Sequence, residues 1–167
     1  MTKLKQIILA FMLVMLPIQV AWADNTELAM AVWNGDLKKV KSIMAKKKIN
    51  GPTLDTLLYG ASEQGHLEVV KYLHSKGADV NVKWNDYIGA PHDCCLTALM
   101  IATKNGHLDI VKFLISKGAR ATTHFRIRDG LTGTITALDF AHNAKKNKDA
   151  LVEILTEAGA YSHIYGQ

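Results

Sequence analysis

The apolar and polar residues from Leu96 to Ala119 alternate with the spacing of two short helices. Thr97 can cap the first helix and Gly106 can end it, while Gly118 can end the second. The residues that would face inward are Ala98, Leu99, Ile101 and Ala102 in the first helix and Leu108, Val111, Phe113 and Leu114 in the second. Helices of about ten residues are marginal in water, so we expect neighbouring segments to cover them.

The same pattern recurs in three other segments of the chain. The segment 55–81 matches it at Thr56, Leu58, Ala61, Gly65, His66, Leu67, Val70, Lys71, Leu73, Ser75, Lys76, Gly77 and Ala78. The segment 135–160 has two extra residues between its helices and keeps Thr136, Ala137, Leu138, Ala141, Val152, Leu155, Gly159 and Ala160. The weakest copy lies near the start and keeps Leu28, Ala31, Gly35, Leu37, Val40, Ile43 and Asn50. Repeated units of this kind stack and bury a continuous core.

These segments resemble ankyrin repeats, whose T-P-L-H-x-A, G-H and L-L-x-x-G-A-D-V-N elements stand here as TALMIA, NGHLDIVKFL and SKGADVN. The resemblance implies an all-α solenoid of about four helix-turn-helix repeats with β-hairpin fingers, at about 25–52, 53–83, 96–124 and 135–162. It also implies that the imidazoles of His66 and His107, in the G-H element, tie one repeat to the next by hydrogen bonds.

The first 23 residues have the pattern of a cleaved signal peptide. Two lysines precede the apolar run 7–20, and Ala21-Trp22-Ala23 followed by Asp24 has the small-x-small form of a cleavage site. A membrane anchor is the alternative, but this run is shorter than the roughly 20 residues that a span needs. We therefore expect cleavage after Ala23, a periplasmic domain over 24–167 and no stable membrane insertion.

Charge gives little support for nucleic-acid binding. The formal net charge is +5, and the two lysines of the leader account for part of it, which leaves +3 for the mature chain. This mild excess is insufficient to predict a nucleic-acid partner. The lysines of the first repeat, Lys38, Lys39, Lys41, Lys46, Lys47 and Lys48, suit the polar outer side of a capping repeat, and contact with an anionic surface is the alternative.

Trp33 is the most informative residue of the first repeat. By alignment it falls where later copies have Glu63 and Lys104, two residues before the helix-ending glycine. The resemblance implies that this position faces a concave groove, where we place Trp33, Lys104 and Asn105. A staple buried within the first repeat is the alternative. Because an exposed tryptophan is costly unless it is used, we favour contact with a partner.

Two consecutive loops are longer than a regular repeat of about 33 residues allows. They span 82–95 and 123–134, whereas the finger after Asn50 would be short, with only 51–54 before Asp55. Aromatic and arginine side chains dominate binding energy at many interfaces. The candidate partner contacts in these fingers are Trp84, Tyr87, Phe125, Arg126 and Arg128. For Tyr87, packing down on the neighbouring repeat is the alternative.

Cys94 and Cys95 are the only cysteines of the chain and lie in the first long finger. An oxidising compartment allows a disulfide or a pair of thiols there. Metal binding together with His92 is a weaker alternative, because adjacent ligands on one tight loop rarely satisfy a tetrahedral site. We predict no metal and no cofactor.

No spacing typical of a catalytic motif occurs in the sequence, so we predict that the chain is not an enzyme. We expect a monomeric, exported scaffold that binds another protein. The most specific hypothesis is an inhibitor or immunity protein that blocks a toxin or an enzyme of the cell envelope. The alternatives are an envelope adaptor, a stress-protection protein, and a metal or redox protein built on the cysteine loop.

Overall fold

A computed structural model describes residues 26–84, 96–126, 132–144 and 146–160. At 83–84, 123–126 and 132–135 we describe the backbone alone. The helices are a first helix at 26–33, α2 (Leu37–Lys46), α3 (Gly51–Gln64), α4 (Leu67–Ser75), α5 (Ala98–Asn105), α6 (Leu108–Ser116), α7 (Ala137–Ala141) and α8 (Lys148–Glu157). The strands are β1 (Lys83–Trp84), β2 (Leu96–Thr97), β3 (Thr122–Arg126) and β4 (Thr132–Thr136).

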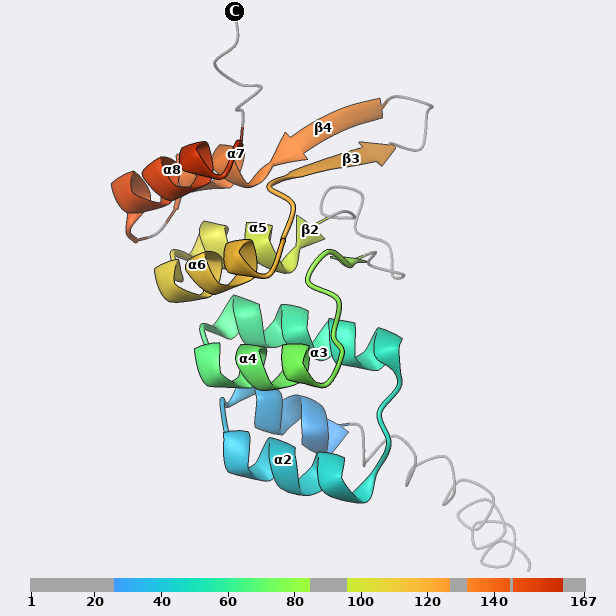
Figure 1. The fold of residues 1–167 in the computed structure, drawn as a ribbon. Coiled ribbons are helices and arrows are strands. Elements are labelled where there is room, and N and C mark those ends of the chain that lie inside the picture. The colour runs from blue at the N-terminus through green and yellow to red at the C-terminus, as the bar shows by residue number, and fades with distance from the viewer. Residues whose placement is uncertain (1–25, 85–95, 127–131, 145, 161–167) are drawn as a thin grey trace, which may run out of the picture.

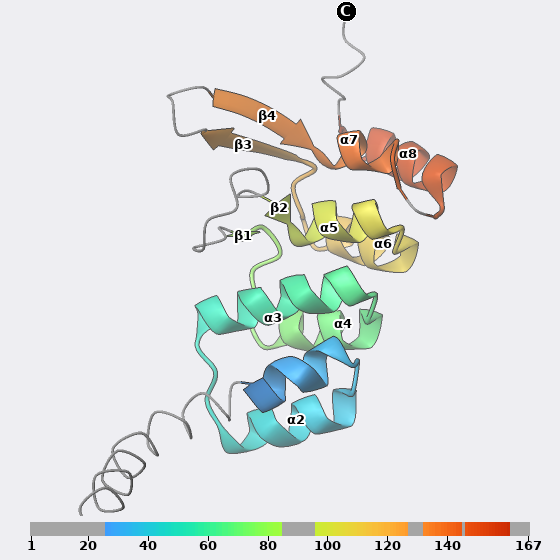
Figure 2. The ribbon, with the colours of Figure 1, turned by 180° about the vertical axis from the view of Figure 1, so that it is seen from behind.

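The helices form antiparallel pairs that stack in chain order (Figure 1). The helix at 26–33, α3, α5 and α7 make one layer, and α2, α4, α6 and α8 make the other, as the view from behind also shows (Figure 2). Both strand pairs lie on the same side of this stack. The prediction of an all-α repeat solenoid with hairpin fingers is therefore confirmed.

The predicted helix boundaries at 96–119 are confirmed by hydrogen bonds. The Thr97 hydroxyl accepts from the amide of Met100 at 3.3 Å and caps α5. Gly106 ends that helix in the left-handed conformation, with φ of 81°. Gly118 is also left-handed, and the amide of Ala119 closes the end of α6 on the Leu114 carbonyl at 3.0 Å.

The core runs through the stack between the two helix layers. One alanine of each first helix is completely or almost completely buried, which lets adjacent repeats approach closely: Ala31, Ala61, Ala102 and Ala141. Val111 and Leu114 of α6 are fully buried, whereas Leu108 and Phe113, also predicted to face inward, are only partly buried. Each repeat thus buries its apolar face against its neighbours.

The predicted short finger after Asn50 is wrong, because residues 51–54 form the first turn of α3. The Asn50 side chain accepts from the amide of Thr53 at 3.0 Å, and Pro52 occupies the first turn, where its fixed φ favours a helix. Thr56, which aligns with the capping Thr97, therefore lies inside the helix. Its hydroxyl donates to the Pro52 carbonyl at 3.0 Å.

Hydrogen bonds from side chains tie each repeat to the next. Nε2 of His66 donates to the Trp33 carbonyl at 2.8 Å, and Nε2 of His107 donates to the Glu63 carbonyl at 2.9 Å. A Cβ on Gly35 would lie 2.5 Å from the His66 ring, so this close approach requires glycine. The tie that the resemblance implied for the two histidines is confirmed.

Candidate interaction surface

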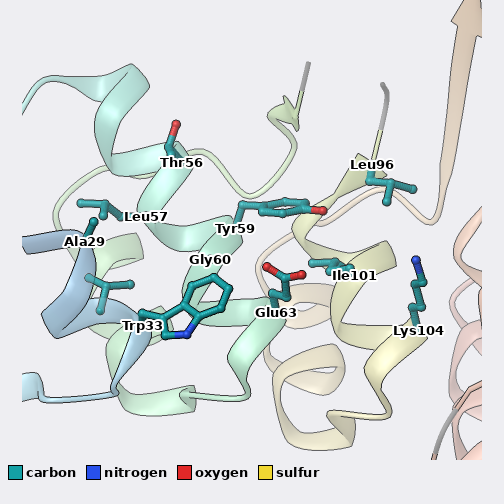
Figure 3. A pocket seen from close by; sticks show the side chains of 11 residues that line it. Ala29, Trp33, Thr56, Leu57, Tyr59, Gly60, Glu63, Leu96, Ile101 and Lys104 are labelled. Carbon is teal, nitrogen blue, oxygen red and sulfur yellow. The ribbon is translucent and has the colours of Figure 1, made fainter. Parts of the chain in front are cut away.

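A groove opens on the face of the stack formed by the helix at 26–33, α3 and α5 (Figure 3). Its volume is about 380 Å³, within the range of pockets that bind ligands. Its lining is mostly apolar and consists of Ala29, Val32, Trp33, Thr56, Leu57, Tyr59, Gly60, Glu63, Leu96, Ile101 and Lys104. Because Leu96 belongs to β2, the groove reaches the base of the first long finger.

Trp33 lies in this groove with half of its surface (51%) exposed to solvent. The alternative of a buried staple is therefore wrong. Its backbone carbonyl accepts the hydrogen bond from His66, which fixes the helix end that carries the indole. The indole is presented to solvent from a backbone position that the next repeat holds in place.

Trp33, Glu63 and Lys104 occupy the same position in consecutive repeats and all line the groove. Lys104 is exposed and Glu63 is half-buried. The groove therefore has an aromatic wall on the first repeat and side chains of opposite charge on the next two. The structure brings together two of the three residues that we placed in the groove from the sequence.

Asn105, the third of them, is not part of the groove lining. Its Nδ2 donates to the Glu63 carbonyl at 3.0 Å, and His107 binds the same oxygen. The Asn105 amide therefore helps to join the second and third repeats.

The backbone of the fingers is described at three of the predicted contact positions. Trp84 lies in β1 opposite Leu96, and Phe125 and Arg126 lie in β3 opposite Gly133 and Thr132. The β3–β4 hairpin projects from the stack beside α7 (Figure 1). Tyr87, Arg128, Cys94 and Cys95 lie outside the described residues.

Several groove or surface residues were missed in the sequence, including Tyr59, Gly60 and Met30. Tyr59 and Gly60 line the groove, and Met30 is 55% exposed on the same helix as Trp33. The signal was present in the alignment, because Gly60 falls where the other copies have Met30, Ile101 and Phe140. A glycine at an aligned position that is otherwise occupied by large apolar residues, which we call the column, indicates a missing side chain.

Comparison with family models identifies the fold independently. The model described as ankyrin repeats (3 copies) matches residues 28–124 and 86–164. The chain belongs to the ankyrin repeat family. Ankyrin repeats serve as scaffolds for protein–protein interaction, which makes a protein the expected partner class. No curated protein matches the chain.

The lysines of the first ankyrin repeat make several contacts within the domain. Lys39 pairs with Glu27 at 3.1 Å, with both side chains about half exposed. Nζ of Lys41 lies 5.4 Å from the centre of the Tyr72 ring in the second repeat, and Nζ of Lys76, also in the second repeat, lies at the same distance from that ring. These contacts fit the interpretation of a solvated capping repeat, because exposed pairs of this kind contribute little energy.

In the part of this ankyrin domain that the structure describes, no group of three or more His, Cys, Asp or Glu side chains could hold a metal ion. Within the same residues, no helix has the length and apolar character needed to cross a membrane.

Proposed function

We propose that this ankyrin domain is a non-catalytic, exported scaffold that binds another protein through its groove and long fingers. Most specifically, we propose an inhibitor or immunity protein that blocks a toxin or an enzyme of the cell envelope. The observation that carries the proposal is the half-exposed indole of Trp33 in an apolar groove. Exposed tryptophans at such places are frequent binding hot spots.

The shape of the domain supports a blocking role. The groove reaches the base of the first finger through Leu96, and the β3–β4 hairpin extends from the same side of the stack as β1 and β2. A rigid body with projecting hairpins can enter the cleft of another protein. Because the helix pairs are folded before the partner binds, less conformational entropy is lost on binding.

The use of the histidines supports a non-catalytic role. The rings of His66 and His107 each donate from Nε2 to a carbonyl of the preceding repeat. Their positions follow from stacking, since each ring lies against a glycine of that repeat, Gly35 or Gly65. Their role in joining neighbouring repeats therefore explains the positions of both histidines without a catalytic role.

The first prediction tests the groove with a captured partner. The protein is recovered from the envelope of an expressing bacterium, where N-terminal sequencing should give Asp24 as the first residue, and is used to capture partners from envelope extract. Trp33→Ala should weaken binding by about 2 kcal/mol or more, roughly 30-fold, because it removes an interface anchor. Lys38→Ala, a change at an exposed position of α2, should cost well under about 1 kcal/mol.

The reverse result would contradict the groove proposal. If Trp33→Ala bound like the parent and Lys38→Ala failed, the partner would be recognising the basic first repeat, as an envelope adaptor would. If the captured partner is an enzyme or a toxin, its activity with and without the ankyrin domain distinguishes an inhibitor from an adaptor. An intact leader at the N-terminus would contradict export in cleaved form.

A further inference from the structure

Gly60 lies in the interior of α3 without a local reason to be glycine. Its φ is not positive, unlike the φ of Gly35, Gly65 and Gly106. A Cβ at Gly60 would meet nothing within 4 Å, whereas one at Gly65 would lie 2.6 Å from the His107 ring. Glycine inside a helix is less stable than alanine by about 0.5–1 kcal/mol. Neither backbone conformation nor packing against the residues that the structure describes accounts for Gly60.

The other repeats have large apolar side chains at this position. Met30 precedes Gly60 in the column, and Ile101 and Phe140 follow it. Met30 is exposed, Ile101 is buried and lines the groove, and Phe140 is partly buried. The column therefore lacks one side chain, on the floor of the groove between Trp33 and Ile101 (Figure 3).

We propose that this gap is a socket for one large apolar side chain of the partner. The Gly60 socket consists of Trp33, Leu57, Tyr59, Gly60 and Ile101, all of which line the groove. The inserted side chain would take the place that a methionine, isoleucine or phenylalanine takes in the other repeats. The inference rests on the proposed protein-binding function and names the chemistry that the partner brings to it.

The charges beside the socket define the neighbours of the inserted side chain. Glu63 and Lys104 line the same groove on successive repeats and carry opposite charges. A matching partner segment has a basic side chain next to Glu63 and an acidic one next to Lys104. Complementary charges of this kind orient a segment and exclude the reversed register.

Random dodecapeptides displayed on phage provide a defined probe. Peptides are selected on the purified protein, and those whose binding is lost with Trp33→Ala are kept. Their affinities are then measured on Gly60→Ile, which restores the residue type of the third repeat, and on Gly60→Ala. Gly51→Ile is the matched control. Gly51 lies in the same helix, α3, and also has open space around its Cβ position, but it does not line the groove.

We expect Gly60→Ile to weaken these peptides by about tenfold or more, Gly60→Ala to weaken them less, and Gly51→Ile to change affinity by less than about twofold. Each peptide should contain one large apolar residue, and its replacement by alanine should remove the difference between the parent and Gly60→Ile. Gly60→Ile should still unfold in one cooperative thermal transition, and Gly60→Ala should unfold at or above the parent's midpoint, which separates lost binding from lost folding.

Three outcomes would overturn the inference. If peptides that depend on Trp33 bind Gly60→Ile with the same affinity as the parent, the Gly60 socket is contradicted and the groove proposal is unaffected. Peptides anchored by a basic residue alone would show that the occupant has the wrong chemistry. A selection that yields no Trp33-dependent peptide would contradict both the socket and the groove.

Discussion

Two glycines, Gly65 and Gly60, have contrasting roles at the scale of single residues. Gly65 has a φ of 87°, ends α3, and lies so close to His107 that a Cβ would be 2.6 Å from its ring. Gly60 lies in the middle of the same helix with open space around its Cβ position. The first is required by the stack, and the second lowers helix stability while leaving the groove open.

Alanine substitutions at these two positions should have opposite effects on stability. Gly60→Ala should raise the free energy of unfolding by about 0.5–1 kcal/mol, because alanine restricts the unfolded chain and fits the helix. Gly65→Ala should lower it by at least about 1 kcal/mol, because alanine disfavours positive φ and its Cβ displaces the His107 ring. Urea denaturation measures both. A lower midpoint for Gly60→Ala would show that the site is already filled.

The helices differ most in length at the scale of secondary structure. The first helix of the second repeat, α3, has 14 residues, whereas α7 has five and begins with a capping box. In that box the Thr136 hydroxyl accepts from the Asp139 amide at 3.2 Å, while a carboxylate oxygen of Asp139 accepts from the Thr136 amide at 2.8 Å. A helix as short as α7 depends strongly on its cap.

Two threonines that align between repeats should therefore respond differently to the same change. Thr136→Ala should destabilise the fold by about 0.5–2 kcal/mol, because it removes the cap of α7. Thr56→Ala, inside α3, should change stability by less than about 0.5 kcal/mol, since alanine is a good helix former at an exposed position. Chemical denaturation of the two variants checks the difference, and equal losses would contradict the assigned roles.

The sequence predicted the stack and the helix ends at 96–119, but it did not predict the start of α3. Apolar spacing indicated the helix pairs, and the resemblance to ankyrin repeats implied the ties through His66 and His107, because neighbouring repeats of one family share the same packing constraint. The start of α3 was missed because alignment gave more weight to Thr56 than to the capping signal of Asn50 and Pro52. Gly60 was missed because its meaning depends on the neighbouring repeats, which must first be placed side by side.

The stability of the whole molecule depends on interfaces between repeats rather than on one central core. Leu114 is fully buried in α6, which contacts both α4 and α8. Leu114→Ala should lower the free energy of unfolding by about 2–5 kcal/mol, because it leaves a cavity inside the stack. Denaturant titration gives this value, and a midpoint unchanged from the parent would contradict the assignment of Leu114 to the core.

The last junction of the stack has different ties from the others. His107 and Asn105 both bind the Glu63 carbonyl, and the Asn81 side chain also joins the second repeat to Gly118 and Arg120. At the next junction a left-handed Asn147 takes the place of the histidine and donates to the Gly106 carbonyl at 2.9 Å. The fourth repeat also has the short helix α7.

These differences predict that local unfolding of the solenoid begins at its C-terminal end. Local unfolding begins where a helix has little stability of its own, so the five-residue α7 and its partner α8 should exchange their amide hydrogens before the interior repeats do. The β3–β4 hairpin connects α6 to α7, so its position is coupled to the closure of that last repeat. A partner that binds the hairpin would therefore also stabilise the fourth repeat against local unfolding for as long as it stays bound.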